Sequence, residues 1–377
     1  MRILVTDGHY KHTLGAVRLL ADHGHDVIVS APRRMAMASV SRSTWRRVRG
    51  PAAASGEPFL AHLDAMVRRH RPGMILPVGA AACGLLSRHR DRWPGVAIVL
   101  PDAAIMDRAL DKRSMLALAT ELGIAVPRTE EPADDADLER AGGVVGYPLV
   151  IKAPLEGRTG VAYVDEPSGL ATAVAAYRER YDLPPGTMPL LQQRIVGPGL
   201  GVFATYQAGR LRRVMAHRRL REFPATGGES TCCELVHDAA LRNAGRRILD
   251  ALAWHGVAMV EFKRDRTDGR DYLMEVNPKL WGSLDLALAA GAEFPLDLVR
   301  IASGEELPDL GTPDGPLRLC WPLGNDLLHL LARPRSAAAV LRDWFGGART
   351  NVRPSDPLPH LVELATTLGR AVRGGLR

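Results

Sequence analysis

The first hundred or so residues alternate short apolar stretches with stretches in which apolar residues recur every three or four positions. The apolar stretches are RILVTD, DVIVSA, MILPVG and VAIVLP, and the periodic ones are TLGAVRLLADHG and PFLAHLDAMVRRHRP. This alternation is typical of strands and helices in βαβ units. It predicts a doubly wound parallel-sheet domain over residues 1–105. The first turn, TDGHYKHTLG, lacks the GxGxxG pattern of dinucleotide-binding folds, which disfavours a dehydrogenase.

A second pattern follows over residues 106–195. It begins with a helical stretch, DKRSMLALATELG, for which Asp111 is a suitable N-cap. The segment YPLVIKAP is then typical of a buried strand that ends at Lys152. We expect these residues to form a small mixed α/β subdomain.

From residue 201 the pattern becomes rich in strands. VAMVEFKRD and DYLMEVNP flank Asp268-Gly269, a dipeptide typical of the turn in an antiparallel hairpin. We expect residues 196–307 to form a larger subdomain and residues 308–377 to form a helical tail.

Size and charge exclude few classes of protein. The chain has 377 residues, of which 46% are hydrophobic, enough for two or three domains with their own cores. The formal charge of +7 is compatible with a polyanionic partner. The basic residues are scattered, however, in clusters such as STWRRVRG without interleaved aromatic residues. We therefore expect a solvated basic surface and no nucleic-acid partner.

Neither a membrane nor an oxidising compartment is expected. No apolar run reaches the roughly 18 residues of a membrane span, and the N-terminus does not resemble a secretory signal. The four cysteines show no CxxC spacing, which favours reduced thiols and a cytoplasmic location.

Lysine is rare in this chain. Only five of the 49 basic residues are lysine: Lys11, Lys112, Lys152, Lys263 and Lys279. Because arginine supplies the ordinary positive charges, the few lysines are candidates for positions that need a compact ammonium group.

The predicted hairpin carries the strongest metal-binding pattern. Glu275 and Asn277 are two positions apart in one strand, so their side chains share a face, and Glu261 lies on that face too if it pairs with Glu275. Two neighbouring carboxylates repel each other unless a cation lies between them. Hard oxygen ligands suit Mg²⁺ or Mn²⁺. The alternative is a solvated hairpin with two ordinary surface glutamates.

The lysines favour the metal-and-phosphate interpretation. Lys152 ends an apolar strand just before a glycine-containing turn, where an ammonium can reach a bound phosphate. Lys112 lies in the first turn of a helix, where the helix dipole disfavours a cation unless an anion is near. Lys279 follows the metal-binding strand. Together the three positions predict an anion site.

The order of these segments resembles the ATP-grasp superfamily from about Leu110 to Leu307. The segments that carry the resemblance are LDKRSMLALATELGIAVP, YPLVIKAP, LLQQRIVGPGLGV, GVAMVEFKRD and LMEVNPKLWGSLDLALAAGAEFP. AHRRLREFPATGGES and WPLGNDLLHLL further resemble a group of predicted ATP-grasp carboxylate-amine ligases related to the carbamoyl-phosphate synthase large chain. The resemblance implies an α/β fold in which a two-subdomain ATP-grasp unit follows the N-terminal domain.

The resemblance also implies roles for individual residues. Lys112 and Lys152 would bind the α- and β-phosphates of ATP. Backbone groups of the hinge near Gln193, Arg194 and Ile195 would bind adenine. Glu261, Glu275 and Asn277 would coordinate two Mg²⁺ (or Mn²⁺) ions.

Two further residues would act on the reacting groups. Lys279 stands where the family usually has an arginine that steadies the transferred phosphoryl group. Arg219, with Glu222, would reach substrate or the γ-phosphate, and a surface ion pair is the alternative for these two residues. His217 and His255 are expected to be structural, and Trp281 to be a core residue.

The sequence thus predicts an ATP-dependent carboxylate-amine ligase that forms an amide through an acyl phosphate and releases ADP and phosphate. The expected partners are a small-molecule carboxylate and amine, and a homodimer is compatible with the sequence. Two alternatives stay open: a carboxylase that activates bicarbonate, and a nucleotide-binding module without turnover.

Overall fold

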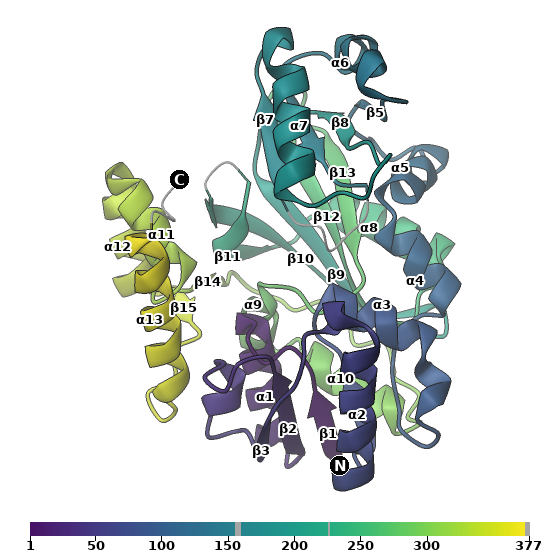
Figure 1. The fold of residues 1–377 in the computed structure, drawn as a ribbon. Coiled ribbons are helices and arrows are strands. Elements are labelled where there is room, and N and C mark those ends of the chain that lie inside the picture. The colour runs from purple at the N-terminus through teal and green to yellow at the C-terminus, as the bar shows by residue number, and fades with distance from the viewer. Residues whose placement is uncertain (155–159, 225–226, 374–377) are drawn as a thin grey trace. The chain divides into compact units, whose positions relative to one another are not determined.

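The computed structural model describes residues 1–154, 160–224 and 227–373, which form two compact units (Figure 1). The first unit comprises residues 1–106, 201–259 and 278–377, and the second comprises residues 107–200 and 260–277. Each unit is built from segments that are far apart in the sequence.

A four-stranded parallel sheet opens the first unit. Its strands are β1 (Arg2–Val5), β2 (Asp26–Ala31), β3 (Arg46–Arg49) and β4 (Met74–Leu76), in the order β3-β2-β1-β4. Its helices are α1 (Lys11–Asp22), α2 (Glu57–His70) and α3 (Ala80–Arg88), followed by α4 (Ala103–Leu110). The predicted parallel-sheet domain is therefore confirmed. Because β4 lies beyond β1, the strand order reverses between these two strands, where open α/β sheets bind their ligands.

A seven-stranded sheet has the order β13-β12-β9-β10-β11-β14-β15. The strands are β9 (Gly199–Gln207), β10 (Arg210–Phe223), β11 (Glu229–Val236), β12 (Gly256–Arg264), β13 (Asp271–Asn277), β14 (Arg318–Cys320) and β15 (Arg349–Thr350). Among the helices that connect its strands are α8 (Ala239–Ala251), between β11 and β12, and α9 (Leu284–Ala289) and α10 (Phe294–Ala302), between β13 and β14. In the first unit Phe203, Trp281 and Phe294 pack together in the hydrophobic core.

The second unit contains a four-stranded sheet of its own. The strands are β5 (Thr129–Glu130), β6 (Leu149–Lys152), β7 (Val161–Val164) and β8 (Leu190–Gln193), in the order β5-β8-β6-β7 with antiparallel pairs. The helices are α5 (Lys112–Glu121), α6 (Leu138–Val145) and α7 (Leu170–Arg180). Ile151 and Leu191, which pair across β6 and β8, are fully buried in its core. Lys152 therefore stands at the end of a well-packed strand.

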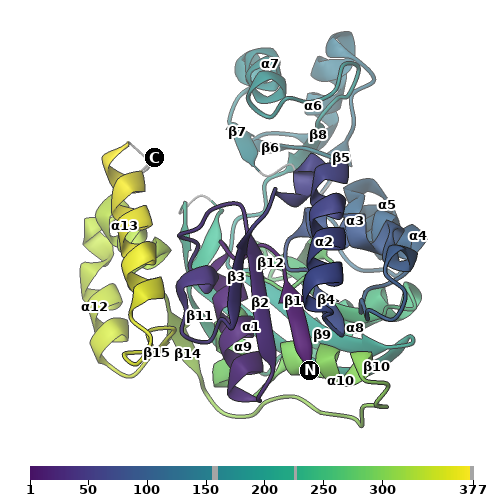
Figure 2. The same cartoon turned by 60° about the horizontal axis from the view of Figure 1, so that its bottom comes forward.

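Towards the C-terminus the described residues form the helices α11 (Asn325–Ala332), α12 (Ala337–Phe345) and α13 (Leu358–Val372), which confirms a helical C-terminal end. Strands β14 and β15 of the seven-stranded sheet also lie between residues 308 and 377. Both views place α12 and α13 side by side (Figures 1 and 2). Arg221 of β10 anchors the tail, because its buried guanidinium forms ion pairs with Asp326 of α11 at 2.9 Å and Asp343 of α12 at 2.5 Å. Breaking such a buried pair on one side is strongly destabilising.

The structure bears on the state of the cysteines and on membrane-spanning helices. All four cysteines are free thiols and are buried. Within residues 1–154, 160–224 and 227–373, no helix is both long enough and apolar enough to cross a bilayer.

Candidate nucleotide and metal site

Lys112 and Glu275 form an ion pair within the second unit. Lys112 is the first residue of α5, whose N-cap Asp111 accepts a hydrogen bond from the backbone N–H of Arg113 at 3.0 Å. The Nζ atom of Lys112 lies 3.4 Å from Oε2 of Glu275, and the two side chains are only 11% and 26% exposed. The carboxylate thus compensates a cation at the positive end of a helix.

Lys152 is held by the neighbouring strand. Its Nζ donates a hydrogen bond to Oε1 of Gln192 on β8 at 2.7 Å, and Nε2 of Gln192 donates in turn to Oγ1 of Thr129 on β5 at 3.0 Å. This chain of polar groups crosses three strands of the four-stranded sheet and fixes where the ammonium lies.

The pKa of Lys152 is lowered to about 8, chiefly because the side chain is buried. The charges of Lys112 and Lys263 lower it further, whereas those of Glu275 and Glu261 raise it. All four side chains therefore act electrostatically on one ammonium group. A partly buried lysine whose pKa is shifted by burial and by nearby charges is a candidate for a functional role.

The alternation predicted for the metal-binding strand is present in β13. Nδ2 of Asn277 donates a hydrogen bond to Oε1 of Glu275 at 3.0 Å, so the two side chains share a face. Leu273, Met274 and Val276 are buried. An amide and a carboxylate thus lie together beside Lys112.

The predicted hairpin is also present. Strands β12 and β13 are neighbours in the sheet, and the backbone N–H of Asp265 donates to the carbonyl of Arg270 at 2.9 Å to close the turn. Gly269 has φ 70°, a conformation that favours glycine. The pairing of Glu261 with Glu275 stays a prediction, supported by their shared effect on the pKa of Lys152.

Lys263 also belongs to this cluster, although no role was predicted for it. Its Nζ donates to the carbonyl of Ile195 at 3.5 Å, and its charge acts on Lys152. The rarity of lysine was the signal that pointed to it. Lys263 is two residues along β12 from Glu261, so the two side chains lie on the same face of the strand.

Backbone hydrogen bonds hold the hinge at the residues expected to bind adenine. The backbone N–H of Gln193 donates to the carbonyl of Arg128 at 2.8 Å, and that of Arg194 to the carbonyl of Pro148 at 3.4 Å. The guanidinium of Arg194 lies 4.8 Å from the ring centroid of Tyr163. The adenine-binding role stays a prediction. Residues 155–159 of the turn LEGRTGVAY, expected to cover the phosphates, lie outside the described residues.

Lys279 lies in the first unit, near the reversal point of the parallel sheet. Burial is the main reason that the pKa of His12, in the first turn of α1, is lowered, and the positive charge of Lys279 is the next largest. It also opposes the burial that raises the pKa of Cys83, in α3. Lys279 forms no ion pair with a carboxylate in the described part of the chain. Its ammonium is therefore available to an anionic ligand.

Arg219 and Glu222 form an ion pair on β10, with Nη1 and Oε1 3.4 Å apart and only 12% and 15% of the side chains exposed. This pair is thus largely buried and differs from an ordinary surface pair. Nδ1 of His217 lies 3.2 Å from Oγ of Ser283, and Nδ1 of His255 accepts from the backbone of Ala208 at 3.1 Å, which supports structural roles for both histidines.

The donor set on β12 and β13 fits a hard divalent cation. Glu261 and Glu275 offer carboxylate oxygens and Asn277 an amide group, without the sulfur or imidazole ligands that softer metals prefer. Glu261 and Glu275 are partly exposed. They therefore leave space for waters or phosphate oxygens, as magnesium sites that also bind nucleotides require.

The chain is similar to known proteins both in part of its sequence and in its fold. Residues 190–322 match the family described as ATP-grasp in the biosynthetic pathway with Ter operon. Among solved structures, the chain resembles N5-carboxyaminoimidazole ribonucleotide synthetase from Thermus thermophilus, with a TM-score of 0.64 and 17% identity over 84% of this chain and 82% of that one. It also resembles L-amino acid ligase from Bacillus licheniformis, with a TM-score of 0.61 and 16% identity over 81% of this chain and 75% of that one.

A third similar structure is a complex with nucleotide. It is the biotin carboxylase domain dimer of 2-oxoglutarate carboxylase from Hydrogenobacter thermophilus, with the magnesium salt of ADP, ADP and bicarbonate. The TM-score is 0.64, with 15% identity over 81% of this chain and 70% of that one. The chain has the ATP-grasp fold, so the resemblance predicted from its sequence is confirmed.

Proposed function

We propose that this protein is an ATP-dependent ligase that joins a small-molecule carboxylate to an amine and releases ADP and phosphate. The observation that carries the proposal is the convergence of Lys112, Lys152, Glu275 and Asn277 within the second unit. Two ammonium groups beside carboxylate and amide ligands suit a nucleotide whose phosphates carry a metal ion.

Glu261, Glu275 and Asn277 would hold two Mg²⁺ or Mn²⁺ ions, which supply charge neutralisation to the β- and γ-phosphates when bound. Lys112 and Lys152 would bind the α- and β-phosphates directly. Gln192, which orients Lys152, fixes the ammonium before the nucleotide arrives and so limits reorganisation during transfer.

The reaction would begin when a substrate carboxylate oxygen attacks the γ-phosphorus and the bond to the β-phosphate oxygen breaks. Lys279 would stabilise the transferred phosphoryl group, and Arg219 would bind substrate. An amine then attacks the acyl carbon, phosphate leaves and the amine loses a proton. The protein supplies positioning and positive charge and needs no covalent nucleophile.

A carboxylase that activates bicarbonate is the second candidate. The observation that favours it is the similarity of the fold to the biotin carboxylase domain solved with bicarbonate. Bicarbonate and an organic carboxylate present the same attacking oxygen, so the site described above serves either reaction.

The test is a screen of carboxylate and amine pools for ADP formation, with and without added bicarbonate. A ligase should form ADP with a carboxylate and an amine after bicarbonate has been removed, and hydroxylamine in place of the amine should trap a hydroxamate. Strict dependence on bicarbonate would favour the carboxylase. Nucleotide binding without ADP formation by any pool would contradict both reactions.

A further inference from the structure

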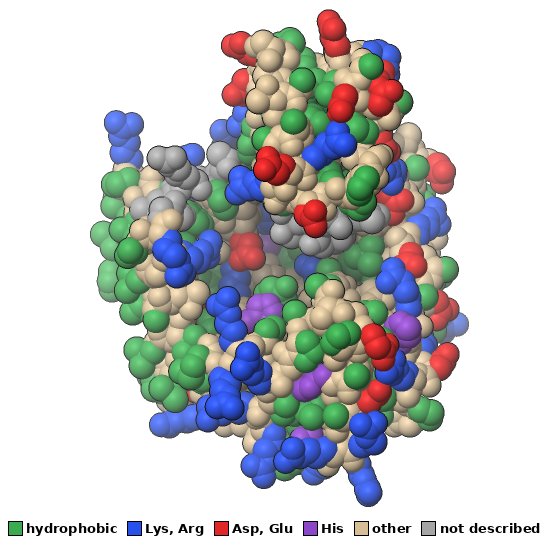
Figure 3. Space-filling view, in the orientation of Figure 1, with side chains coloured by type: hydrophobic (Ala, Val, Ile, Leu, Met, Phe, Trp, Pro, Cys, Tyr) green, Lys and Arg blue, Asp and Glu red, His purple; other side chains and the backbone are tan. Residues whose placement is uncertain are grey.

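A groove in the first unit has an unusual concentration of positive charge. The cavity has a volume of about 920 Å³ and is lined by residues that follow β2, by β3 and by the C-terminal turn of α2. Six of its twelve lining residues are arginines: Arg33, Arg34, Arg46, Arg47, Arg49 and Arg69. Figure 3 shows basic side chains gathered on the lower part of the surface, where Figure 1 places β2 and β3.

These arginines are not neutralised by the protein. All six are exposed, and none forms an ion pair with a carboxylate in the described part of the chain. No acidic residue lines the groove. Elsewhere the exposed arginines commonly have carboxylate partners, as Arg140 has in Asp137 and Glu130. Six like charges around one cavity repel each other, and a bound anion would relieve that repulsion.

Ser39 supplies a second and independent observation. Its side chain lines the groove and is only 4% exposed, yet its Oγ has no hydrogen-bond partner in the described ranges. A buried hydroxyl without a partner destabilises a fold. A ligand oxygen in the groove would provide the missing partner, since a hydroxyl can donate to a phosphate.

Trp45 and Arg46 shape the mouth of the groove. The guanidinium of Arg46 lies 5.0 Å from the centroid of the Trp45 ring, and Trp45 is 41% exposed. This cation–π contact restrains a guanidinium whose planar fork of donors matches phosphate geometry. The groove therefore has positive charge and at least one donor group restrained by an aromatic contact.

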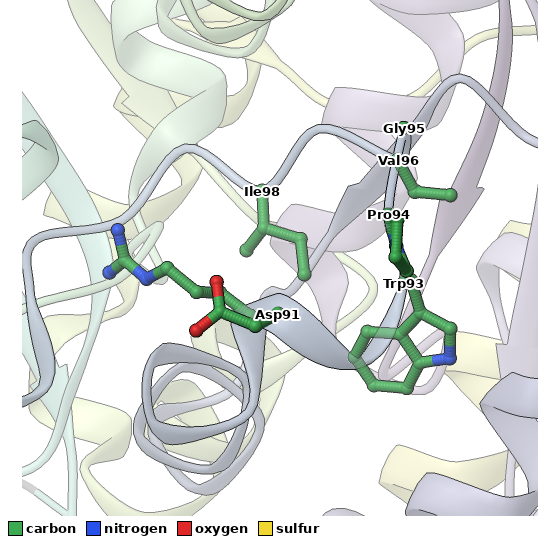
Figure 4. A pocket seen from close by; sticks show the side chains of 7 residues that line it. Asp91, Trp93, Pro94, Gly95, Val96 and Ile98 are labelled. Atoms are coloured by element: carbon green, nitrogen blue, oxygen red, sulfur yellow. The ribbon is translucent and has the colours of Figure 1, made fainter.

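Another cavity lacks these properties. It has a volume of about 400 Å³ and is lined by Asp91, Trp93, Ile98 and their neighbours (Figure 4). Its single arginine, Arg90, already donates to the carbonyl of Pro101 at 2.5 Å and pairs with Asp102 at 3.2 Å. Positive charge without a partner is thus a property of the β2–β3 groove and not of this second cavity.

We propose that the β2–β3 groove binds a small molecule that carries two or more phosphoryl groups, at a site separate from the nucleotide cluster of the second unit. Its volume falls within the roughly 300–1,000 Å³ typical of small-molecule sites. Several arginines suit several phosphoryl groups, because each guanidinium can bind two phosphate oxygens. The proposal does not rest on the ligase reaction.

Calorimetry with inorganic tripolyphosphate tests the proposal. The full chain would carry Lys112→Met and Lys152→Met, so that the nucleotide cluster does not bind the probe. Adding Arg46→Gln, Arg47→Gln and Arg69→Gln should raise the dissociation constant at least tenfold. The matched control, Arg333→Gln with Arg335→Gln and Arg342→Gln, removes as many exposed charges from the helical tail and should change it less than twofold.

Equal losses in the two triple variants, or no saturable binding before the groove is altered, would overturn the proposal. A labelled single-stranded oligonucleotide that binds the groove when tripolyphosphate does not would overturn it in favour of nucleic acid. Ser39→Ala gives a further readout. It should weaken tripolyphosphate binding several-fold while the melting temperature stays the same or rises, whereas a merely structural hydroxyl would leave binding unchanged.

Discussion

The ammonium of Lys112 lies 3.4 Å from a carboxylate oxygen of Glu275, although the two residues belong to α5 and β13 and are far apart in the sequence. Glu275 also accepts a hydrogen bond from Asn277. One carboxylate therefore links a proposed phosphate-binding lysine to the proposed metal ligands, and its removal should affect both.

Glu275→Gln should lower turnover with ATP by at least a hundredfold, because the amide keeps the shape of the side chain and loses its charge. The fold should survive, since β13 keeps its buried face. Turnover across a magnesium titration is the measurement. Glu131→Gln is the matched control, because Glu131 pairs with the neighbouring Arg113 of α5. Near-normal turnover in Glu275→Gln would remove the metal assignment.

Lys152 should make ATP binding dependent on pH. Burial lowers the pKa of its ammonium to about 8, so the nucleotide-free protein loses this charge above that pH and must recover a proton to bind phosphate. The dissociation constant for an ATP analogue should therefore rise as the pH increases from 8 to 9.5. Lys152→Met should bind more weakly by roughly 2–4 kcal/mol at pH 7 and lose the dependence. Parallel profiles for the two proteins would contradict the role.

The same pKa has a consequence for stability. The unfolded chain holds this proton up to its ordinary pKa of 10.5, so the charged, partly buried Lys152 destabilises the folded state below pH 8. The destabilisation caused by charged Lys152 should decrease as the pH rises from 8 to 10.5. The free energy of unfolding of the wild type should accordingly approach that of Lys152→Met across this range, measured by urea denaturation. A constant difference between the two would contradict the buried ammonium.

Lys279 should affect transfer more than nucleotide binding. It belongs to the first unit, outside the cluster of Lys112 and Lys152. Lys279→Met should lower kcat at least tenfold with little change in the dissociation constant for ATP, because we propose that its ammonium stabilises the transferred group. Lys279→Arg, which introduces the residue that the ATP-grasp resemblance implies at this position, should retain most of the rate. A change confined to ATP affinity would show that Lys279 serves nucleotide binding instead.

Arg219 can be compared with its neighbour Arg218. Arg219 is largely buried beside Glu222, whereas Arg218 is exposed and pairs with Glu234. Arg219→Gln should raise KM for the carboxylate at least tenfold, and Arg218→Gln should change it less than twofold. Steady-state kinetics at saturating ATP separate the two. Equal effects in the two variants would assign Arg219 to structure.

Much of the site could be predicted because its residues break local patterns. Glu275 and Asn277 interrupt an apolar strand at alternate positions, and Lys152 ends another apolar strand in a chain where lysine is rare. Such conflicts between a residue and its local pattern are expected at functional sites. The distance between Lys112 and Glu275 could not be predicted, because it depends on how α5 packs beside the hairpin.

In the helical tail, the sequence pattern does not predict which side chains are buried. An amphipathic pattern normally places its apolar face inside. In α13, however, His360, Glu363 and Thr367 are buried, while Leu361 and Leu368 are 59% and 46% exposed. The buried polar face reflects partners from distant segments, such as the hydrogen-bonding contact between Arg18 and His360 at 3.2 Å. Tertiary contacts of this kind leave no periodic signal in the sequence.

The nucleotide product tests the central claim most directly. Wild-type protein would be incubated with ATP, Mg²⁺ and the carboxylate and amine pools that support product formation, and the nucleotides separated by ion-exchange chromatography. Transfer of the γ-phosphoryl group predicts ADP and phosphate in equal amounts, with little of either when the amine or the carboxylate is omitted, and much less of both from Lys152→Met. AMP and pyrophosphate as the main products would contradict the account.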